Sequence, residues 1–569
     1  MTPEVTLLPP VKTEVRGGVF FADFGQDAYG KLRLTLPESM DSGDFTVRLG
    51  EKLKGDGTID RHPGGSVRYA EFHVPIQTGS GVYELPPAMP ERRTPVQMPQ
   101  EIGEVAPFRY AEVEGLSTPP EAKGVRQAFV HAHFREDASA FECSDATLNA
   151  VWKLCKHTME ATSAFGIYID GDRERKPYEA DAYINFLSHM ACDADPGVGR
   201  ATFVYLLGDP TWPTEWSFHM VMLAEAEYEA TGDAGLARQN YEAIEKKLLM
   251  EKARPDGLLQ APGIIDWPAS ERDGYDSGDP HAAKGPMMGP EINTVVNAFY
   301  FHALMKMSKL AKAAGHADDA LTFTTKAAQV GAAFNRVFYN EGRGCYVDGE
   351  GSGHASLHAN MFALAFGLVP PDRQKSVADF VEGRGMACSV YGAQYLLEAL
   401  YKSGRADAAL KLMTSHEMRS WQHMLDLGST MTMEAWDPSI KPNLTWNHAW
   451  GSAPANIISR YVLGVQPLEA GYGKILIAPQ PGGLAWMNGT VPTARGPVEV
   501  RMQGGAGMRL EVNIPAGATA MVKVPLQNGA AGAGALLLNG KAVVPRREGD
   551  ALVVDNLPAG RTVLQMGGR

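Results

Sequence analysis

The period of the hydrophobic pattern changes twice along the chain, and this change limits the folds that the sequence can adopt. Up to residue 138, apolar and polar positions alternate in short runs broken by Gly and Pro, as in VFFADF (19–24), KLRLTL (31–36) and SVRYAEFHVPI (66–76). Alternation of this kind is typical of half-buried strands. From about residue 140 the apolar spacing becomes three to four residues, as in WSFHMVMLAEAEYEATGD (216–233) and in residues 291–315 and 391–404. Residues 146–169 also look like buried helix, and after about residue 465 the alternation returns. The sequence therefore predicts a helical region between two β regions.

A weak repeat runs through the helical region. Residues 228–244, 310–328 and 400–414 each read as helix, glycine, short polar turn and a new Ala-rich helix. The glycine of each turn is expected to take the left-handed conformation that ends a helix: Gly232, Gly315 and Gly404. Helical hairpins in series favour an α/α toroid, although a right-handed solenoid gives the same local pattern. We predict three domains, a β-sandwich over 1–138, an α/α barrel over 139–464 and a second β-sandwich over 465–569.

The charge balance argues against nucleic acid and anionic membranes as partners. The chain has 53 Lys and Arg against 66 Asp and Glu, a net charge of −13, and the basic residues are scattered. No segment approaches the ~20 apolar residues of a membrane span, and residues 1–18 lack the charged start and apolar core of a signal peptide. A cytoplasmic location is expected as the sequence stands, and a periplasmic or secreted one if a signal peptide has been removed. The oligomeric state is left open, with a homodimer as one option.

The five cysteines are an odd number, widely spaced, with no Cys-x-x-Cys pair. They are Cys143, Cys155, Cys192, Cys345 and Cys388. This pattern predicts reduced, structural thiols rather than a disulfide framework.

Four loops of the helical region are unusually rich in charged and aromatic residues. They span residues 169–181, 208–216, 264–281 and 428–454, and three of them carry six tryptophans between them: Trp212, Trp216, Trp267, Trp436, Trp446 and Trp450. Indole faces pack on the C–H faces of a pyranose while carboxylates, Arg and His bond its hydroxyls. A single tryptophan is more readily explained by core packing, but the four loops together predict a sugar site.

Glycoside hydrolysis needs one protonated and one ionised carboxyl across the scissile bond. In IDGDRERKPYEAD (169–181), Glu174 is the candidate acid because four neighbouring carboxylates would raise its pKa by like charge. These neighbours are Asp170, Asp172, Glu179 and Asp181. Arg173 and Arg175 act in the opposite direction, and Glu434, on a distant loop, is the candidate base. The alternative is that the two arginines and the acids form only a structural ion-pair network.

The patterns for metal binding are weak. Asp170, Asp172, Glu174 and Asp181 lack the turn glycine and the closing Glu of a helix-loop-helix calcium site. His448 has no His or Cys partner at a spacing suited to zinc. No metal and no cofactor are therefore expected.

These residues also carry a family resemblance. The chain resembles the bacterial α-L-rhamnosidases of the six-hairpin glycosidase group, glycoside hydrolase family 78. The family's first motif, an Asp, a short spacer, an Arg-Glu-Arg segment and a second Asp seven residues after the Glu, is matched by Asp170, Arg173, Glu174, Arg175 and Asp181. Its second motif, a Glu followed by x-Trp-Asp and then Asn-His before Gly-Ser, is matched at these positions: Glu434, Trp436, Asp437, Asn447, His448, Gly451 and Ser452.

Segments outside the helical region extend the resemblance. Residues 22–34 and 107–115 resemble the family's N-terminal β-domain, and 491–500 resembles its C-terminal sandwich, so the resemblance covers nearly the whole chain. The chain is short for the family, so accessory β-domains are expected to be missing.

The resemblance implies a central (α/α)6 barrel flanked by N-terminal and C-terminal β-sandwich domains. It also implies inverting exo-hydrolysis of terminal α-L-rhamnosyl residues without a cofactor, with Glu174 as general acid and Glu434 as the base that activates water. The implied contacts to rhamnose hydroxyls are Asp170, Arg173, Asp181 and His448, and the implied pocket walls are Trp216 and Trp267. Further candidate contacts are Tyr178, Asp266 and Trp436. The expected partner is a rhamnose-containing glycoside or oligosaccharide.

The first motif departs from the family pattern in two places. Gly171-Asp172 replaces a Cys-Pro, and residues 176–180, KPYEA, replace Leu-Gly-Trp-Thr-Gly, so Tyr178 stands where an indole is expected. These departures affect the identity of the sugar more than the reaction type. Two alternatives stay open: a related glycosidase or lyase acting on another deoxy or uronic sugar, and a catalytically silent carbohydrate-binding protein. Retention of both Glu174 and Glu434 argues against the second.

Overall fold

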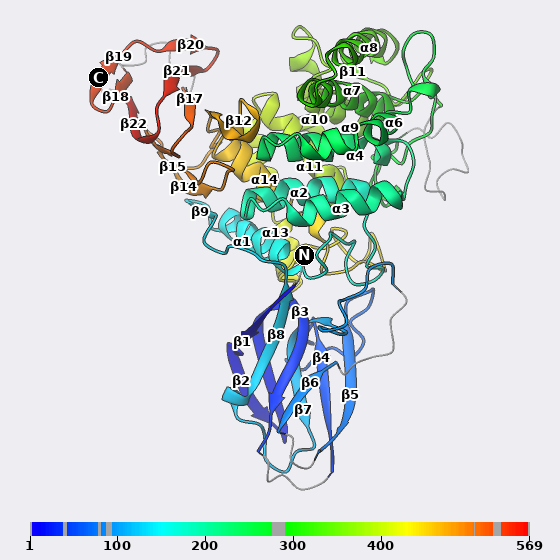
Figure 1. The fold of residues 1–569 in the computed structure, drawn as a ribbon, viewed down its shortest axis with the longest axis vertical. Helices are drawn as coiled ribbons and strands as arrows, with labels where there is room; N and C mark the ends of the chain where they lie inside the picture. The colour runs from blue at the N-terminus through cyan, green and yellow to red at the C-terminus, as the bar shows by residue number, and fades with distance from the viewer. Residues whose placement is uncertain are drawn as a thin grey trace.

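The computed structural model describes residues 3–37, 43–77, 81–86, 94–275, 291–505, 507–526 and 536–566. Figure 1 shows the N-terminal strands below, the helices above them, and the C-terminal strands beside the helices at upper left. The order of elements along the chain is strands, helices and strands, as predicted.

Eight N-terminal strands form one hydrogen-bonded sheet. They are β1 (Glu4–Leu8), β2 (Lys12–Arg16), β3 (Val19–Thr35), β4 (Asp44–Gly50), β5 (Tyr69–Pro75), β6 (Val82–Leu85), β7 (Ala106–Glu114) and β8 (Val125–His131). The order is β1-β8-β3-β7-β4-β5, and β2 and β6 also pair with β3. The sequence predicted separate strands at 19–24 and 31–36, but β3 runs through both, with an irregular pairing to β7 between Asp23 and Ala28. Strand β3 therefore connects two groups of strands, because it pairs with β2 over residues 19–23 and with β6 and β8 over residues 30–35.

The central region consists mainly of helices. They are α1 (Ala146–Ala161), α2 (Glu179–Cys192), α3 (Gly197–Gly208), α4 (Glu215–Thr231), α5 (Gly235–Gln239), α6 (Tyr241–Lys246), α7 (Thr294–Ala314), α8 (Ala317–Val337), α9 (Leu357–Ala365), α10 (Gln374–Arg384), α11 (Val390–Lys402), α12 (Ala406–Met413), α13 (Trp421–Asp426) and α14 (Ala453–Ile457). A short strand pair, β10 (Tyr339–Asn340) and β11 (Cys345–Tyr346), interrupts them.

Six of these helices close a ring. Each helix contacts the next in the order α2, α4, α7, α9, α11 and α14, and α14 also contacts α2. All residues of α9 and α14 are buried, whereas α8 and α12 bury only one face against the ring. The inner helices read as hydrophobic all round because they contact neighbours on every side.

The glycine predictions for the helical repeat are confirmed. Gly232 and Gly315 end α4 and α7 with φ of 75° and 97°, and Gly404 follows α11 with φ of 74°. The predicted buried helix over 146–169 is shorter than expected, since α1 ends at Ala161 and a turn with Gly166 at φ 70° follows it. This turn starts the loop that leads to the first charged motif.

The C-terminal strands form two sheets. The first has the order β12-β13-β17-β21-β20 and the second β19-β18-β22-β16-β15-β14-β9. Their bounds are β9 (Ala140–Cys143), β12 (Val465–Pro467), β13 (Lys474–Ile477), β14 (Trp486–Val491), β15 (Val498–Gln503), β16 (Arg509–Ile514), β17 (Thr519–Pro525), β18 (Leu536–Leu538), β19 (Lys541–Val543), β20 (Arg546–Glu548), β21 (Ala551–Leu557) and β22 (Gly560–Met566). Strand β9 lies just before the first helix in sequence but pairs with β14, so the start of the helical region is fastened to the C-terminal sheet.

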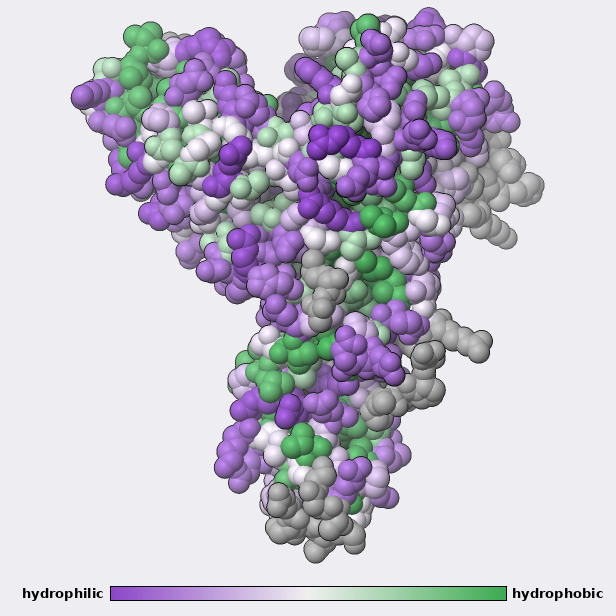
Figure 2. All heavy atoms as spheres, viewed as in Figure 1, coloured by the Kyte–Doolittle hydropathy of each residue, from purple (hydrophilic) through white to green (hydrophobic). Residues whose placement is uncertain are grey.

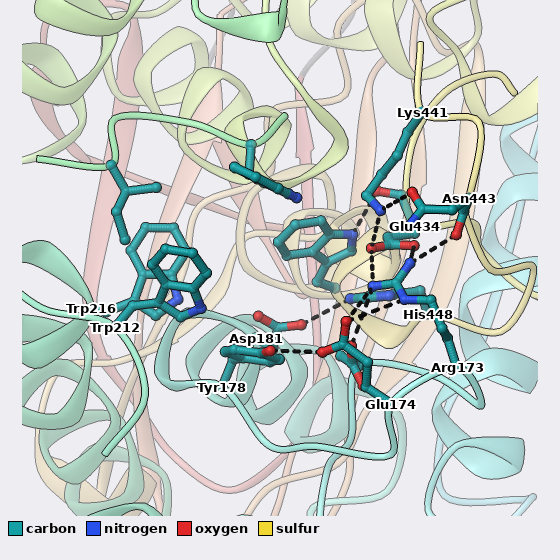
Figure 3. A pocket seen from close by; sticks show the side chains of 14 residues that line it. Arg173, Glu174, Tyr178, Asp181, Trp212, Trp216, Glu434, Lys441, Asn443 and His448 are labelled. Atoms are coloured by element: carbon teal, nitrogen blue, oxygen red, sulfur yellow. Dashed lines mark hydrogen bonds and ion pairs between the residues drawn. The ribbon is translucent and has the colours of Figure 1, made fainter. Parts of the chain in front are cut away.

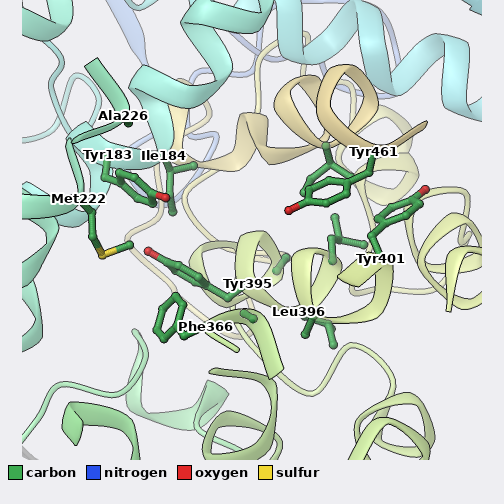
Figure 4. Packing of buried hydrophobic residues seen from close by; sticks show 14 of the residues in the cluster. Tyr183, Ile184, Met222, Ala226, Phe366, Tyr395, Leu396, Tyr401 and Tyr461 are labelled. Carbon is green, nitrogen blue, oxygen red and sulfur yellow. The ribbon is translucent and has the colours of Figure 1, made fainter. Parts of the chain in front are cut away.

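The largest apolar cluster extends from the helices into the C-terminal sheets. Figure 4 shows its aromatic part, where Tyr183 and Tyr395 face each other inside the ring and Tyr401 stacks on Tyr461 with ring centres 5.3 Å apart. All five cysteines are buried and free, as predicted. On the face in Figure 2, hydrophobic residues form small separate groups among hydrophilic ones. Within the described ranges, no helix has both the length and the apolar character that crossing a membrane requires.

Candidate active site

A cavity of about 160 Å³ lies where the loops before α2, α4, α7 and α14 meet. Nine of the eleven predicted site residues line it: Asp170, Arg173, Glu174, Tyr178, Asp181, Trp216, Trp267, Glu434 and His448. Five further residues line it as well: Trp212, Ile264, Lys441, Asn443 and Trp450. In Figure 3 the labelled indoles of Trp212 and Trp216 lie on one side of the cavity and the charged side chains on the other. The cavity thus has an apolar wall and an ionic wall.

Arg173 joins the two candidate catalytic carboxyls. Its Nη1 lies 2.7 Å from Glu434 Oε2, and its Nη2 lies 3.0 Å from Glu434 Oε1 and 3.2 Å from Glu174 Oε1 (Figure 3). Because one nitrogen contacts both carboxyls, their nearest oxygens lie within about 6 Å of each other. The two glutamates are 260 positions apart in sequence, yet they share one cavity.

Glu434 is held as a carboxylate by the cations around it. Besides its contacts with Arg173, it lies 3.1 Å from Lys441 Nζ and accepts the backbone N–H of Thr445 at 3.1 Å. Burial acts to raise the pKa of Glu434, but His448, Arg173 and Lys441 together outweigh burial and hold that pKa below its ordinary value. A carboxyl in this setting is ionised at neutral pH, as a general base must be.

The pKa prediction for Glu174 is wrong in direction. The Glu174 side chain is 42% exposed, and although burial acts to raise its pKa, the Tyr178 hydroxyl that donates to it at 2.8 Å and the Arg173 charge lower it. It is the pKa of Asp170 that is raised. Asp170 is only 3% exposed, so burial is the main cause, and repulsion by the Glu174 charge is the next largest. The directions of the two pKa shifts therefore favour Asp170 over Glu174 as the protonated member of this pair.

Two of the four predicted neighbours of Glu174 turn away from it. Asp172 is buried and ion-paired with Arg68 and with Arg175, the latter at 2.7 Å. Glu179 instead accepts the backbone N–H of Thr211 at 2.8 Å. The structural-network alternative therefore holds for Arg175 and Asp172, whereas Arg173 faces the cavity.

Asp181 and His448 form a buried pair at the floor of the cavity. His448 Nε2 lies 2.8 Å from Asp181 Oδ1, and the His448 ring lies 4.6 Å from that of Trp450. Burial raises the pKa of Asp181, although the contact with His448 acts to lower it. The polar edges of both residues border the cavity, where they could bond sugar hydroxyls.

The apolar wall is held in place by a buried carboxyl. Trp212 and Trp267 lie with ring centres 6.1 Å apart. Behind them, Glu215 accepts the backbone N–H of Ile265 at 2.6 Å and also that of Ile264, whose side chain lines the cavity. Burial raises the pKa of Glu215 to about 7, so this group titrates near neutrality.

Two predicted contacts, Asp266 and Trp436, lie outside the cavity lining and need correction. Asp266 is fully buried, 2.7 Å from His358 Nε2, and accepts the backbone N–H of Ser389 at 3.0 Å. Trp436 is fully buried and donates its indole N–H to the carbonyl of Cys388 at 2.8 Å. Both residues fix loops behind the cavity, because their polar atoms are used by protein partners.

The N-terminal sheet supports the second motif from below. The Asn447 side chain accepts the Tyr29 hydroxyl at 2.9 Å and the Asp172 backbone N–H at 2.8 Å, and it donates to Glu51 at 2.8 Å. Gly171, at φ 91°, has no room for a Cβ, which would lie 2.9 Å from Asn447 Oδ1. The positive φ and the close contacts explain why a glycine stands at position 171.

The residues that sequence reasoning missed gave little signal. Asn443 accepts Arg173 Nη1 through its backbone carbonyl at 2.8 Å, which no side-chain pattern reveals. Ile264 and Lys441 belong to loops with no periodicity. Trp212 and Trp450 were noted as loop tryptophans but not as contacts. Within the described segments, no three His, Cys, Asp or Glu side chains are grouped to hold a metal ion.

Comparison with family models matches two parts of the chain. Residues 136–462 match the bacterial alpha-L-rhamnosidase 6 hairpin glycosidase domain, and 464–535 match the bacterial alpha-L-rhamnosidase C-terminal domain. The first match alone covers more than half of the 569 residues.

Relatives of known sequence and structure agree with these matches. An alpha-L-rhamnosidase from Streptomyces avermitilis is 26% identical over 559 residues, covering 90% of this chain and 49% of its own length. One from Formosa agariphila is 23% identical over 550 residues, covering 89% and 55%. The chain therefore spans about half the length of these relatives.

Solved structures share the fold. An alpha-L-rhamnosidase from Dictyoglumus thermophilum superposes with a TM-score of 0.81 at 19% identity, covering 100% of this chain and 64% of its own. The Streptomyces avermitilis enzyme complexed with L-rhamnose gives 0.79 at 20% identity, covering 99% and 54%.

Proposed function

We propose, because the chain belongs to the family of bacterial α-L-rhamnosidase six-hairpin glycosidases, that it hydrolyses terminal α-L-rhamnosyl residues of glycosides or oligosaccharides. The observation that carries the proposal is the ionic wall of the cavity, where Arg173 holds Glu174 and Glu434 together opposite an indole wall. One wall suits the two carboxyls of glycoside hydrolysis and the other suits the apolar face of a sugar ring.

In the proposed reaction, Glu174 protonates the glycosidic oxygen while Glu434 takes a proton from the attacking water. The C–O bond to the aglycone breaks as the bond from water forms on the opposite face, so the anomeric configuration inverts. Glu434 ends protonated and Glu174 ionised, and solvent exchange restores both. The lowered pKa of Glu434 supports the base role because this carboxyl is ionised before substrate arrives.

The acid role requires a proton transfer within the Asp170–Glu174 pair. Burial raises the pKa of Asp170, whereas the pKa of Glu174 is lowered. A sugar hydroxyl that donates to Asp170 would stabilise its ionised form, and the proton would then move to Glu174 beside the leaving oxygen. Asp170 would thus both bind the sugar and load the acid.

We also propose the finer architecture. The ring of α2, α4, α7, α9, α11 and α14, with helices packed outside it, supports an (α/α)6 barrel over residues 139–464. The proposed flanking domains are 1–138 and 465–569. Strand β9 lies within the barrel range in sequence but pairs with β14 of the C-terminal sheet. The remaining proposed sugar contacts are Asp181, His448, Tyr178, Trp216 and Trp267, all of which line the cavity.

A second candidate is hydrolysis of a uronic or other deoxy sugar. The observation in its favour is that two cations, Arg173 and Lys441, line the cavity and could meet a sugar carboxylate. Both cations are already paired with Glu434, which makes the rhamnoside the better substrate proposal.

A panel of aryl glycosides separates the candidates. We expect release of p-nitrophenol from the α-L-rhamnoside and far less from the β-D-glucuronide, α-L-fucoside and β-L-arabinoside. NMR of the first-formed sugar should show the inverted anomer. Turnover of the glucuronide alone would refute the rhamnoside proposal, and a retained anomer would refute the roles of the two glutamates.

A further inference from the structure

Trp486 differs in its surroundings from the other tryptophans of the chain. It is 37% exposed. All nine tryptophans lie in the described ranges, and six of them are at most 4% exposed. It stands at the start of β14, a strand of the seven-stranded C-terminal sheet that is labelled in Figure 1. Its neighbour Met487 points inward and is fully buried, so the strand alternation directs the indole to solvent.

The strand register places polar side chains in a grid around this indole. Trp486 is directly opposite Gln503 on β15, and Gln503 is opposite Arg509 on β16. In the next row, Asn488 is opposite Arg501, and Arg501 is opposite Glu511. Directly opposed residues lie ~5 Å apart and diagonal ones ~7–8 Å apart, so the grid is about as large as two pyranose rings.

Two shallow depressions lie along the grid. A depression of about 310 Å³ is lined by the six grid residues, and one of about 450 Å³ continues from it towards β9. Asn488 and Arg501 line both depressions, so the two form one groove. Its lining extends across β16, β15 and β14 to β9, which suits a chain of sugar units better than a single small molecule.

The charges along the groove cancel. The cations that line it are Arg501, Arg509 and Lys153, and the carboxylates are Glu142, Glu499 and Glu511. Arg509 lies 3.3 Å from Glu511 and Arg501 lies 3.6 Å from Glu499. A balanced face with mixed donors and acceptors complements an uncharged, hydroxyl-rich ligand.

From these observations we propose that the groove around Trp486 is a second saccharide-binding site, which takes neutral pyranose units of a glycan chain. The indole face would stack on one ring, and Asn488, Gln503 and the arginines would bond hydroxyls. The site belongs to the C-terminal sheet and shares no residue with the catalytic cavity. It would hold a polymer to the protein independently of which terminal sugar the cavity cleaves.

Affinity electrophoresis of the whole chain tests the proposal. The parent is Glu434→Gln, which prevents hydrolysis, and the gels contain rhamnan, galactan or xylan, with polygalacturonate as the acidic comparison. We expect at least one neutral polysaccharide to retard the parent. Trp486→Ala should weaken that binding about tenfold and Asn488→Ala severalfold, since stacking and hydrogen bonds are lost. Val544→Ala, at a fully exposed position outside the groove, is the matched control and should leave retardation unchanged.

The outcomes are distinct. Retardation in the gel does not require hydrolysis, so failure of the activity proposal would not alter this test. In the active protein, Trp486→Ala should keep kcat/KM for the aryl rhamnoside within twofold. The site proposal is overturned if no neutral polysaccharide retards the parent, if only polygalacturonate does, or if Trp486→Ala is retarded like the parent.

Discussion

Replacing Arg173 by Met should move the acidic limb of the pH profile for hydrolysis upward. Arg173 contacts Glu434 at 2.7 and 3.0 Å, and its charge is among those that keep the pKa of Glu434 low. Unit charges ~4 Å apart near a protein surface interact by about 4 kcal/mol at an effective dielectric constant of ~20. An opposite charge at this range commonly lowers a carboxyl pKa by ~1–3 units.

The sign follows from the role of Glu434 as base. With the guanidinium removed, its pKa rises and burial then favours the protonated form, which cannot accept a proton from water. We expect the lower limb of kcat/KM to shift up by ~1–3 pH units in Arg173→Met, and by less in Arg173→Lys, which keeps a charge. The measurement is kcat/KM for p-nitrophenyl α-L-rhamnoside between pH 3 and 9.

A matched control is available in the same motif. Arg175 is fully buried and pairs with Asp172 and Glu104 away from the cavity, so Arg175→Met should lower thermal stability without moving the limb in the folded fraction. If Arg173→Met lowers kcat/KM equally at all pH values, Arg173 only binds substrate and the argument about Glu434 fails.

Three further predictions concern other parts of the molecule. Glu174→Gln should lose ~10²- to 10⁴-fold on a natural disaccharide but much less on a dinitrophenyl glycoside, whereas Glu434→Gln should be crippled on both and partly rescued by azide; the reverse pattern would exchange their roles. Ile264→Ala should raise KM severalfold with kcat nearly unchanged, because it removes apolar wall area that contacts sugar before and during reaction; an unchanged KM would exclude Ile264 from contact. The pKa of the buried Asp27 is raised to about 6, mainly by burial. The folded protein therefore binds the Asp27 proton more tightly than the unfolded chain does, and the free energy of unfolding falls as pH rises from ~4 to 6. Asp27→Asn should therefore raise the unfolding temperature at pH 8 but not at pH 4, and an equal change at both would show that the proton is not the cause.

The sequence predicted the parts of the fold that depend on periodicity. Helices α4, α7 and α11 were located to within a few residues, because each has a long apolar stripe and two of them end at a glycine. Strands β1 and β2 were missed because nearly all of their residues are exposed or only partly buried, so no alternation marks them. Strand β9 could not be assigned to its sheet because its partner β14 lies almost 350 residues later.

The site residues were predicted from side-chain chemistry. The prediction was wrong for side chains whose polar atoms bond other protein groups in the interior. Glu174, Glu434 and Arg173 are brought together as expected. Asp266 has the same composition signal, a carboxylate beside a tryptophan, but His358 and Ser389 bind it in the interior. The direction of the Glu174 pKa depended on which neighbours turn inward, and sequence spacing does not determine that.

The hydrogen bonds of Asn447 limit how this protein could be divided or recombined. A fragment restricted to the helical region would lack Tyr29 and Glu51, which fix Asn447 beside the cavity residue His448. It would also lack Arg68, which neutralises the buried Asp172. A chimera that exchanges the N-terminal sheet with that of a relative would have to carry these three residues along.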